Sequence, residues 1–176
     1  MGQNHSFTGD ELSELQKGNS LTQAQIMKLH KRFKKLDTDG SGDIDRNEFK
    51  AIPSLASNPL IDRVLSIFDA DGNGTVSFQE FVRALSIFSP DTPTENKQRF
   101  LFALYDADND GKISNRDLYR VLQIMVGSNL SDTQLQQIVD KTFIEADLNR
   151  DGYLDFAEFQ KILGHSDVGE KLNLNM

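Results

Sequence analysis

The chain has 176 residues, of which 38% are hydrophobic and 26% charged, enough apolar side chains for a packed core in one or two small domains. Its net charge of −8 argues against nucleic acid as a partner and favours cations or basic partners. The absence of cysteine excludes disulfides, thiol catalysis and cysteine-ligated zinc, and no apolar run approaches the roughly 18 residues of a membrane-spanning helix, so we expect a cytoplasmic protein.

Residues 1–20 are expected to form a separate segment that carries a lipid. The opening sequence MGQNHS matches the pattern for N-myristoylation of Gly2. A single myristoyl chain gives only marginal, reversible attachment to membranes, and a basic patch is the usual second signal. Because the first 16 residues contain no Lys or Arg but do contain Asp10, Glu11 and Glu14, we expect at most weak, peripheral membrane association.

Four twelve-residue windows repeat one arrangement of acidic residues and glycine. They read DTDGSGDIDRNE, DADGNGTVSFQE, DADNDGKISNRD and DLNRDGYLDFAE, and they begin at Asp37, Asp69, Asp106 and Asp147. Calcium takes roughly six to eight oxygen ligands, and this spacing supplies side-chain oxygens at positions 1, 3, 5 and 12 with a backbone carbonyl at position 7. Position 6, where the chain must turn with positive φ, is always glycine. The sequence therefore predicts four calcium-binding EF-hand loops.

The predicted ligands occupy the same five positions in each loop. In the first two loops they are Asp37, Asp39, Ser41, Asp43 and Glu48, then Asp69, Asp71, Asn73, Thr75 and Glu80. In the last two loops they are Asp106, Asp108, Asp110, Lys112 and Asp117, then Asp147, Asn149, Asp151, Tyr153 and Glu158. Position 9 often acts through water, and it is occupied by Asp45, Ser77, Ser114 and Asp155.

One ligand departs from this pattern, because position 12 of the third loop is Asp117 instead of glutamate. Its side chain is one methylene shorter, so we expect it to struggle to reach calcium with both oxygens. Losing one oxygen favours a six-coordinate site, which suits magnesium. We favour a third loop that binds calcium less selectively and competes with magnesium. The alternative is that Asp106, Asp108 and Asp110 supply enough charge for Asp117 to close the site.

Amphipathic helices are expected on both sides of every loop, which gives an all-α fold of four EF-hands in two paired lobes. Position 8 of the loops should form a short β-ladder within each pair, through Ile44, Val76, Ile113 and Leu154. Helix starts are marked by capping boxes at Thr22 with Gln25 and at Ser131 with Gln134. We expect an N-terminal lobe over 21–88, a linker over 89–95, a C-terminal lobe over 96–164 and a tail over 165–176.

Aromatic residues also follow the loops, and they allow two interpretations. Phe81 and Phe159, which come directly after position 12, fit either ordinary core packing or an apolar groove that opens for a partner helix. Calcium binding opens a sensor EF-hand pair and exposes such a groove. The chain has only four methionines, so a groove of Phe, Leu, Ile and Val would suit one dedicated partner better than many.

The stretches KRFKKLD, IFDADGNG, RFLFALYDAD and MVG…QLQQIVDKT, spread over nearly the whole chain, resemble the calcineurin B family. These proteins are regulatory subunits of the calcium/calmodulin-activated serine/threonine protein phosphatase. The resemblance implies a noncatalytic subunit that binds a long amphipathic helix of the catalytic subunit. It also implies a surface where substrate docking peptides and immunophilin–drug complexes bind, matched here by Leu122, Met125, Val126, Asn129 and Leu130. Ordinary helix packing is the alternative for Leu122, Met125 and Val126.

Two other classes of EF-hand protein remain as alternatives. A recoverin-like calcium–myristoyl switch also begins with Met-Gly, but that family usually has a degenerate first loop, and here the first loop is intact. A calcium buffer would need neither a groove nor an acyl site. An enzyme is the least favoured interpretation, because His5, His30 and His165 are isolated and the carboxylates are committed to metal.

Overall fold

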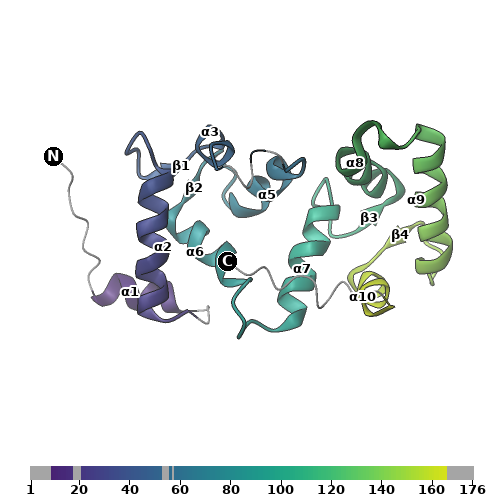
Figure 1. The fold of residues 1–176 in the computed structure, drawn as a ribbon. Coiled ribbons are helices and arrows are strands. Elements are labelled where there is room, and N and C mark those ends of the chain that lie inside the picture. The colour runs from purple at the N-terminus through teal and green to yellow at the C-terminus, as the bar shows by residue number, and fades with distance from the viewer. Residues whose placement is uncertain (1–8, 18–20, 53–55, 57, 166–176) are drawn as a thin grey trace. The chain divides into compact units, whose positions relative to one another are not determined.

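The computed structural model describes residues 9–17, 21–52, 56 and 58–165, and this part of the chain is helical with two small antiparallel sheets (Figure 1). Its described residues up to 56 and over 68–92 form one compact unit, and those over 58–67 and from 93 onward form a second. Each unit contains one pair of loops, which confirms the all-α fold with paired EF-hands. The exact lobe boundaries stay a prediction.

The first unit contains helices that flank loops 1 and 2, joined by the first sheet. Its elements are α1 (Gly9–Gln16), α2 (Gln23–Leu36), β1 (Asp43–Ile44), α3 (Arg46–Lys50), β2 (Val76–Ser77) and α6 (Phe78–Ser86). Helix α5 (Ile61–Phe68) leads into loop 2, and all of it but Phe68 groups with the second unit.

The second unit repeats this arrangement around loops 3 and 4. Its elements are α7 (Thr94–Tyr105), β3 (Ile113–Ser114), α8 (Asn115–Val126), the 3-10 helix η1 (Gly127–Asn129), α9 (Asp132–Ala146), β4 (Tyr153–Leu154) and α10 (Phe156–His165).

Both predicted capping boxes are present and set where α2 and α9 begin. The backbone N–H of Thr22 donates to Gln25 Oε1 at 2.7 Å, and the Thr22 hydroxyl accepts from the Gln25 N–H at 3.3 Å. Ser131 and Gln134 make the same reciprocal pair. Each box satisfies two N–H groups that a helix start would otherwise leave without partners.

The β-ladders pair the loops as the position-8 residues predict. Ile44 lies opposite Val76, and Ile113 lies opposite Leu154. All four side chains are at most 2% exposed, so each ladder is also the centre of its unit's core. This arrangement fixes the two loops of a pair side by side.

Phe81 and Phe159 belong to these cores, as the packing interpretation of the aromatic residues predicts. Phe81 is 4% exposed and its ring lies 5.5 Å from that of Phe33. Phe159 is 6% exposed and its ring lies 5.4 Å from that of Phe102. Edge-on aromatic pairs of this kind stabilise a packed interior. In this structure both residues pack in the cores, and a groove that opens around them for a partner helix stays a prediction.

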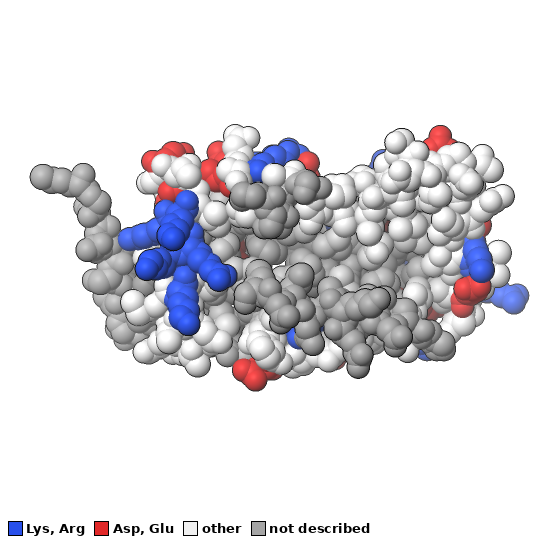
Figure 2. All heavy atoms as spheres, in the orientation of Figure 1, with Lys and Arg blue, Asp and Glu red and all other residues white. Residues whose placement is uncertain are grey.

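The surface of the first unit carries an uneven distribution of charge. Lysine and arginine side chains gather over α2, which leads into the acidic loop 1 (Figure 2). This helix holds five Lys and Arg residues and no Asp or Glu, although the whole chain has a net charge of −8.

Candidate metal centres

Each loop is folded around its first aspartate. The position-1 carboxylate accepts a hydrogen bond from the backbone N–H of the position-6 glycine, at 2.9–3.1 Å, in the pairs Asp37–Gly42, Asp69–Gly74, Asp106–Gly111 and Asp147–Gly152. These glycines have φ between +84° and +96°, where a side chain would be strained. The turn therefore aims the loop's side-chain oxygens inward.

Carboxylates converge in three of the loops. One oxygen from each of three acids lies within 4.8 Å of the others in the sets Asp37, Asp39 and Glu48; Asp69, Asp71 and Glu80; and Asp106, Asp108 and Asp110. No lysine or arginine whose side chain is described forms a salt bridge with any of these nine carboxylates. Like charges at this separation repel unless a cation joins them, and a hard divalent cation prefers oxygen donors. The donor sets therefore fit calcium.

Loop 1 also shows where its position-7 carbonyl lies. The Ser41 hydroxyl donates to the Asp43 backbone oxygen at 3.0 Å, so the position-5 and position-7 oxygens lie close together. The Ser41 N–H donates to Asp39 Oδ1 at 2.8 Å. This contact is the largest cause that lowers the pKa of Asp39. The carboxylate is thus ready to bind a cation.

Loop 4 replaces one acid by Asn149 but has the same internal contacts. The Asp151 N–H donates to Asn149 Oδ1 at 2.8 Å and to Asp147 Oδ1 at 3.2 Å. Lys112 of loop 3 lies 3.6 Å from Asp151 Oδ2, a partly exposed pair between the two loops. Asp147 Oδ1 and Asn149 Oδ1 therefore lie side by side at the Asp151 N–H, while the acids of loop 4 do not form a close group like those of loops 1, 2 and 3.

The position-12 glutamates join the end of each loop to its beginning. Glu48 Oε1 accepts from the backbone N–H groups of Thr38 at 2.6 Å and Asp39 at 3.3 Å, while Oε2 accepts from the Asp45 N–H at 3.0 Å. Burial alone would raise the pKa of Glu48, but these hydrogen bonds outweigh it and lower the pKa. Glu80 and Glu158 make the corresponding contacts in loops 2 and 4.

Asp117 makes only half of these contacts. Its Oδ2 accepts from the backbone N–H of Ser114 at 3.0 Å and from the Ser114 hydroxyl. Neither Ala107 nor Asp108, both in the described part of the chain, donates to it, and it is absent from the acidic cluster of Asp106, Asp108 and Asp110. The side chain is 3% exposed, and its hydrogen bonds with Ser114 hold it at the end of the loop.

Positions 9 and 12 have a second function that the sequence analysis did not identify in these loops. Asp45 with Glu48, Ser77 with Glu80, and Ser114 with Asp117 are reciprocal capping boxes that start the helices after loops 1, 2 and 3. The signal was present in the sequence, because an N-cap residue followed three positions later by an acid is the capping-box pattern. Metal ligation and helix initiation therefore depend on the same side chains.

A further residue near loop 3 could not be found from sequence spacing. The Arg63 guanidinium, from α5, donates to the backbone carbonyls of Ala103 at 2.6 Å, Ala107 at 3.1 Å and Leu104 at 3.4 Å, and also to that of Asp106. These carbonyls lie at the C-terminal end of α7, where a helix leaves acceptors without partners and favours a cation. Arg63 therefore fixes the position at which loop 3 begins.

The acids of loop 3 also repel one another. Burial raises the pKa of Asp106, and the neighbouring charges of Asp110 and Asp108 raise it further, against the lowering effect of the Gly111 N–H. A bound cation would relieve that repulsion.

The matched docking residues lie at the end of α8 and just after it. Met125 is 47% exposed and Asn129 is exposed, whereas Leu122, Val126 and Leu130 are half-buried. Leu122 also packs against the core cluster of the second unit, so helix packing accounts for part of its surface. The five residues are thus close in sequence and partly accessible.

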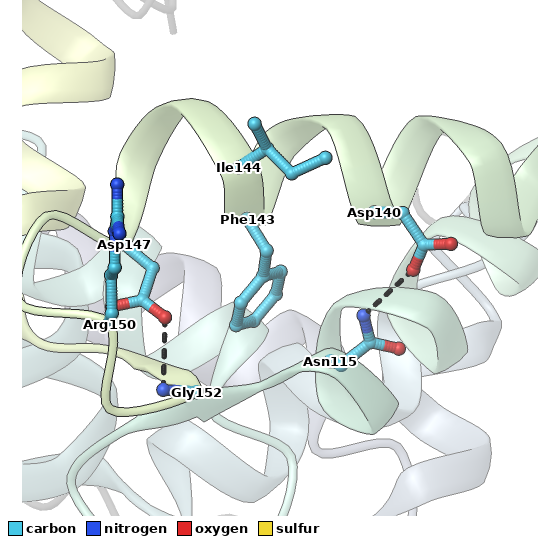
Figure 3. Close-up of a pocket in the computed structure, with 7 residues that line it drawn as sticks. All are labelled: Asn115, Asp140, Phe143, Ile144, Asp147, Arg150 and Gly152. Atoms are coloured by element: carbon cyan, nitrogen blue, oxygen red, sulfur yellow. Dashed lines mark hydrogen bonds between the residues drawn. The ribbon is translucent and has the colours of Figure 1, made fainter.

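A pocket lies between α9 and loop 4 (Figure 3). Phe143 points from α9 toward the loop, and Asp140 accepts a hydrogen bond from Asn115 Nδ2 at 3.2 Å. Ile144 is 83% exposed on the same helix. Two lining residues belong to the loop pattern of the sequence analysis, Asp147 at position 1 and Gly152 at position 6.

Gly2, the expected site of lipidation, lies outside the described residues, as does the tail beyond residue 165. Within the described residues, none of the helices combines the length and the apolar character needed to cross a bilayer.

Known proteins resemble this chain over its full length. Residues 26–86 and 95–164 each match the model of the EF-hand domain pair. The calcineurin B subunit of Naegleria gruberi is 52% identical, with all of both chains covered. The calcineurin B subunit of Schizosaccharomyces pombe is 49% identical over 99% of both chains, and the type 1 calcineurin B subunit of Dictyostelium discoideum is 48% identical over 99% of this chain and 98% of its own.

Proposed function

Because the chain belongs to the calcineurin B family of EF-hand proteins, we propose that it is the noncatalytic, calcium-binding regulatory subunit of a calcineurin-type serine/threonine protein phosphatase. The observation that carries this proposal is the 52% identity over the whole of both chains. The converging carboxylates of loops 1, 2 and 3 support the calcium-binding part of it.

Calcium is proposed to bind in all four loops, through the ligands named at positions 1, 3, 5, 7 and 12. When bound, calcium would neutralise the negative charge of these carboxylates. The third site is proposed to be less selective and to compete with magnesium, because Asp117 makes no contact with the beginning of its loop. Magnesium keeps close to octahedral geometry and usually retains several waters, so it needs fewer protein oxygens.

The partner is proposed to be a calcineurin A-like catalytic subunit, which presents an amphipathic helix. An amphipathic helix buries its apolar face in a hydrophobic groove. The exposed side chains of Ile124, Met125 and Ile138, from α8 and α9 of the second unit, support an apolar contact surface there. Substrate docking peptides and immunophilin–drug complexes are proposed to bind at the shared surface of Leu122, Met125, Val126, Asn129 and Leu130.

The identity to calcineurin B subunits over the whole chain favours the regulatory subunit over the recoverin-like switch and the calcium buffer. Loop 1, which is degenerate in recoverin-like proteins, has converging carboxylates at Asp37, Asp39 and Glu48. We propose a cytoplasmic protein whose contact with membranes is peripheral, with Gly2 as the acylated residue.

Affinity capture tests the partner. The full chain, immobilised through its C-terminus, should retain a phosphatase catalytic chain from lysate of the source cells, and the purified chain should show no phosphatase activity until that partner is added. Capture of no phosphatase chain, with calcium or with a chelator, would overturn the proposal.

Paired variants test the docking surface. Met125→Ala with Asn129→Ala should weaken binding of substrate docking peptides to the reconstituted phosphatase, while Ile144→Ala, at a side chain 83% exposed on α9, should leave it unchanged. Equal effects of the two changes would count against the docking assignment while leaving the regulatory assignment intact.

A further inference from the structure

Loop 2 contains an asparagine that is followed directly by glycine. Asn73 and Gly74 are positions 5 and 6 of this loop, which connects α5 to β2 (Figure 1), and the sequence Asn-Gly occurs nowhere else in the chain. Both residues are exposed, so water reaches them. The side-chain amide of asparagine is an electrophile, and the backbone nitrogen of the next residue is a nucleophile held close to it by the chain. The pair can therefore react within the molecule.

The side-chain oxygen of Asn73 is held by two hydrogen-bond donors. Asn73 Oδ1 accepts from the backbone N–H of Thr75 at 2.8 Å and from the Thr75 hydroxyl at 2.9 Å. The hydroxyl has a second acceptor, Asp43 Oδ2, which lies farther away at 3.2 Å. Attack on the amide carbon would place negative charge on Oδ1, and donors aimed at such an oxygen stabilise the tetrahedral intermediate. Thr75 thus activates the Asn73 amide for attack.

The attacking nitrogen, that of Gly74, is unhindered. Apart from its neighbours in the chain, none of the described residues lies within 4 Å of the place where a Cβ on Gly74 would be. The Gly74 N–H donates to Asp69 Oδ2 at 2.9 Å. A carboxylate that accepts this hydrogen bond makes the nitrogen more nucleophilic and relays its proton.

The other three loops, all within the described residues, each lack part of this arrangement. Position 5 is Ser41 in loop 1, Asp110 in loop 3 and Asp151 in loop 4. A hydroxyl is not an electrophile, and an ionised carboxylate repels a nucleophile. Asn149 of loop 4 has the amide, and its Oδ1 accepts from the Asp151 N–H at 2.8 Å, but the side chain of Arg150 crowds the next nitrogen. Only loop 2 combines the amide, the donors and the glycine.

We propose that Asn73 is a site of spontaneous deamidation and that calcium in loop 2 controls its rate. Gly74 N attacks Asn73 Cγ, the new C–N bond closes a succinimide ring, and the Cγ–Nδ2 bond breaks. The proton of Gly74 N leaves with Nδ2 as ammonia. Water then opens the ring at either carbonyl, so the balance is a gain of water and a loss of ammonia. One opening gives aspartate in the normal chain, and the other gives isoaspartate, in which the chain continues through the side chain.

The control by calcium rests on the proposed function, because Asn73 is the position-5 ligand of loop 2. Attack requires the Asn73 side chain to turn its amide carbon toward the Gly74 nitrogen. An ion bound to Asn73 Oδ1 and to the carboxylates of this loop would hold the side chain in the ligand position. If only the free loop reacts, calcium at about 100 times its dissociation constant leaves about 1% of the loop free and slows the reaction up to about 100-fold.

Deamidation would change the metal site in which it occurs. Loop 3 shows that the normal product fits, because Asp110 accepts from the Lys112 N–H at 2.9 Å and lies in the acidic cluster of that loop. A fourth carboxylate in loop 2 should raise its calcium affinity, which depends on the charge of the ligands. Isoaspartate lengthens the chain before Gly74 and should weaken the site. A period without calcium would therefore leave a covalent change in loop 2.

Peptide mass spectrometry tests the proposal on the full-length chain, aged at physiological temperature in chelator or in saturating calcium. The peptide with Asn73 should acquire the deamidation mass in chelator, and roughly 10- to 100-fold more slowly in calcium. The peptide with Asn149 is the internal control and should react far more slowly in chelator. Isoaspartate is identified by methyl transfer from S-adenosylmethionine with an isoaspartate methyltransferase.

Variants at Thr75 separate this chemistry from simple exposure of the loop. Position 7 supplies only its backbone carbonyl to the proposed metal site, so the side chain can be changed without removing a ligand. Thr75→Val should slow deamidation in chelator by about 3- to 10-fold, less than the loss of such a donor in a water-excluded active site. Thr75→Ser, which keeps the hydroxyl, should react at the wild-type rate.

Variants at position 12 test the control by calcium. Glu80→Gln in loop 2 should lose the protection by calcium, while Glu158→Gln in loop 4 should keep it. Equal protection in both variants would overturn the control by calcium in loop 2. If calorimetry shows the same number of bound calcium ions in Glu80→Gln and the wild-type chain, loop 2 is not a calcium site and the proposed function fails there instead.

The chemistry itself is judged in chelator, where the metal has no part. Equal rates at Asn73 and Asn149 would overturn the proposed site. A Thr75→Val variant that reacts as fast as Thr75→Ser would overturn the activation by the hydroxyl.

Discussion

Lengthening the one short ligand, through Asp117→Glu, should convert loop 3 to the arrangement of the other loops. In loop 1, Glu48 joins the loop's end to the N–H groups of Thr38 and Asp39 at its beginning. Asp117 contacts only Ser114. One added methylene would extend the carboxylate toward Ala107 and Asp108, the equivalent positions, and would allow both oxygens to reach a bound calcium.

The size of the effect follows from the polar interaction that the longer side chain would add. A hydrogen bond or equivalent polar interaction with a charged group contributes about 1.5–3 kcal/mol. The Asp117→Glu variant should therefore bind calcium at site 3 roughly 10- to 100-fold more tightly. Magnesium should bind little more tightly, because its octahedral shell already includes water. In calorimetric calcium titrations, with and without magnesium at its cellular concentration, the calcium affinity of one site should change and those of the other three should not.

The reciprocal change in loop 4 is the matched control. Glu158 accepts from the N–H groups of Leu148 at 2.9 Å and Asn149 at 3.2 Å, so Glu158→Asp should lose both hydrogen bonds. That variant should lower calcium affinity at site 4 by a similar factor and make it sensitive to magnesium. If Asp117→Glu leaves both affinities at site 3 unchanged, the reach of the side chain does not determine selectivity and the reasoning fails.

Three further changes test the remaining features. Saturating calcium should raise the thermal midpoint measured by circular dichroism far above that in chelator, with magnesium less effective, because the metal binds only the folded arrangement of converging carboxylates; equal midpoints would contradict this. Phe81→Ala should lower the free energy of unfolding by about 3–5 kcal/mol in urea titrations, since Phe81 is 4% exposed. A loss below about 1 kcal/mol would contradict the burial of this side chain. Arg63→Met should lower the free energy of unfolding by about 2–3 kcal/mol, against less than about 0.5 kcal/mol for Arg116→Met, at an exposed side chain. Similar losses for the two variants would contradict the role of Arg63 at the C-terminal end of α7.

The loops and ladders could be predicted because everything that defines them lies within twelve residues. Ligand positions, the glycine turn and the apolar position 8 are all local, and the pairing of Ile44 with Val76 followed from the expectation that neighbouring EF-hands pair. The capping boxes at Thr22 and Ser131 are local too. The interpretation of Asp117 was possible for the same reason, since only the length of one side chain was involved.

Features that depend on which side of a helix faces the core were harder to predict from the sequence. Phe81 and Phe159 have the spacing of both a core and a groove, and only packing shows that they are buried. The stretch KRFKKLD was used as a family resemblance, and its charges were not assigned to a face. Ile26 and Phe33 are buried, so the charged residues of α2 lie on its outward side. Periodicity alone does not show what that outward side contacts.

Arg63 was beyond sequence reasoning, because its acceptors lie 40–44 residues away. Its role explains how loop 3 begins at a fixed position without the hydrogen bonds that glutamate provides elsewhere. In loops 1, 2 and 4, the position-12 carboxylate holds the N–H groups at positions 2 and 3.

In loop 3, Arg63 instead holds the carbonyls of Asp106 and Ala107, which are positions 1 and 2, from outside the loop. The carbonyls of Asp106 and Ala107 share their peptide groups with the N–H groups of Ala107 and Asp108, so the two restraints act on the same two peptide groups and should substitute for one another. A double-mutant cycle would then give a larger stabilisation by Asp117→Glu in the Arg63→Met background than in the wild-type chain, by about 1 kcal/mol, the coupling expected of residues that act on one network. Additive effects would mean that Arg63 stabilises α7 alone, and that the beginning of loop 3 is fixed by some other interaction.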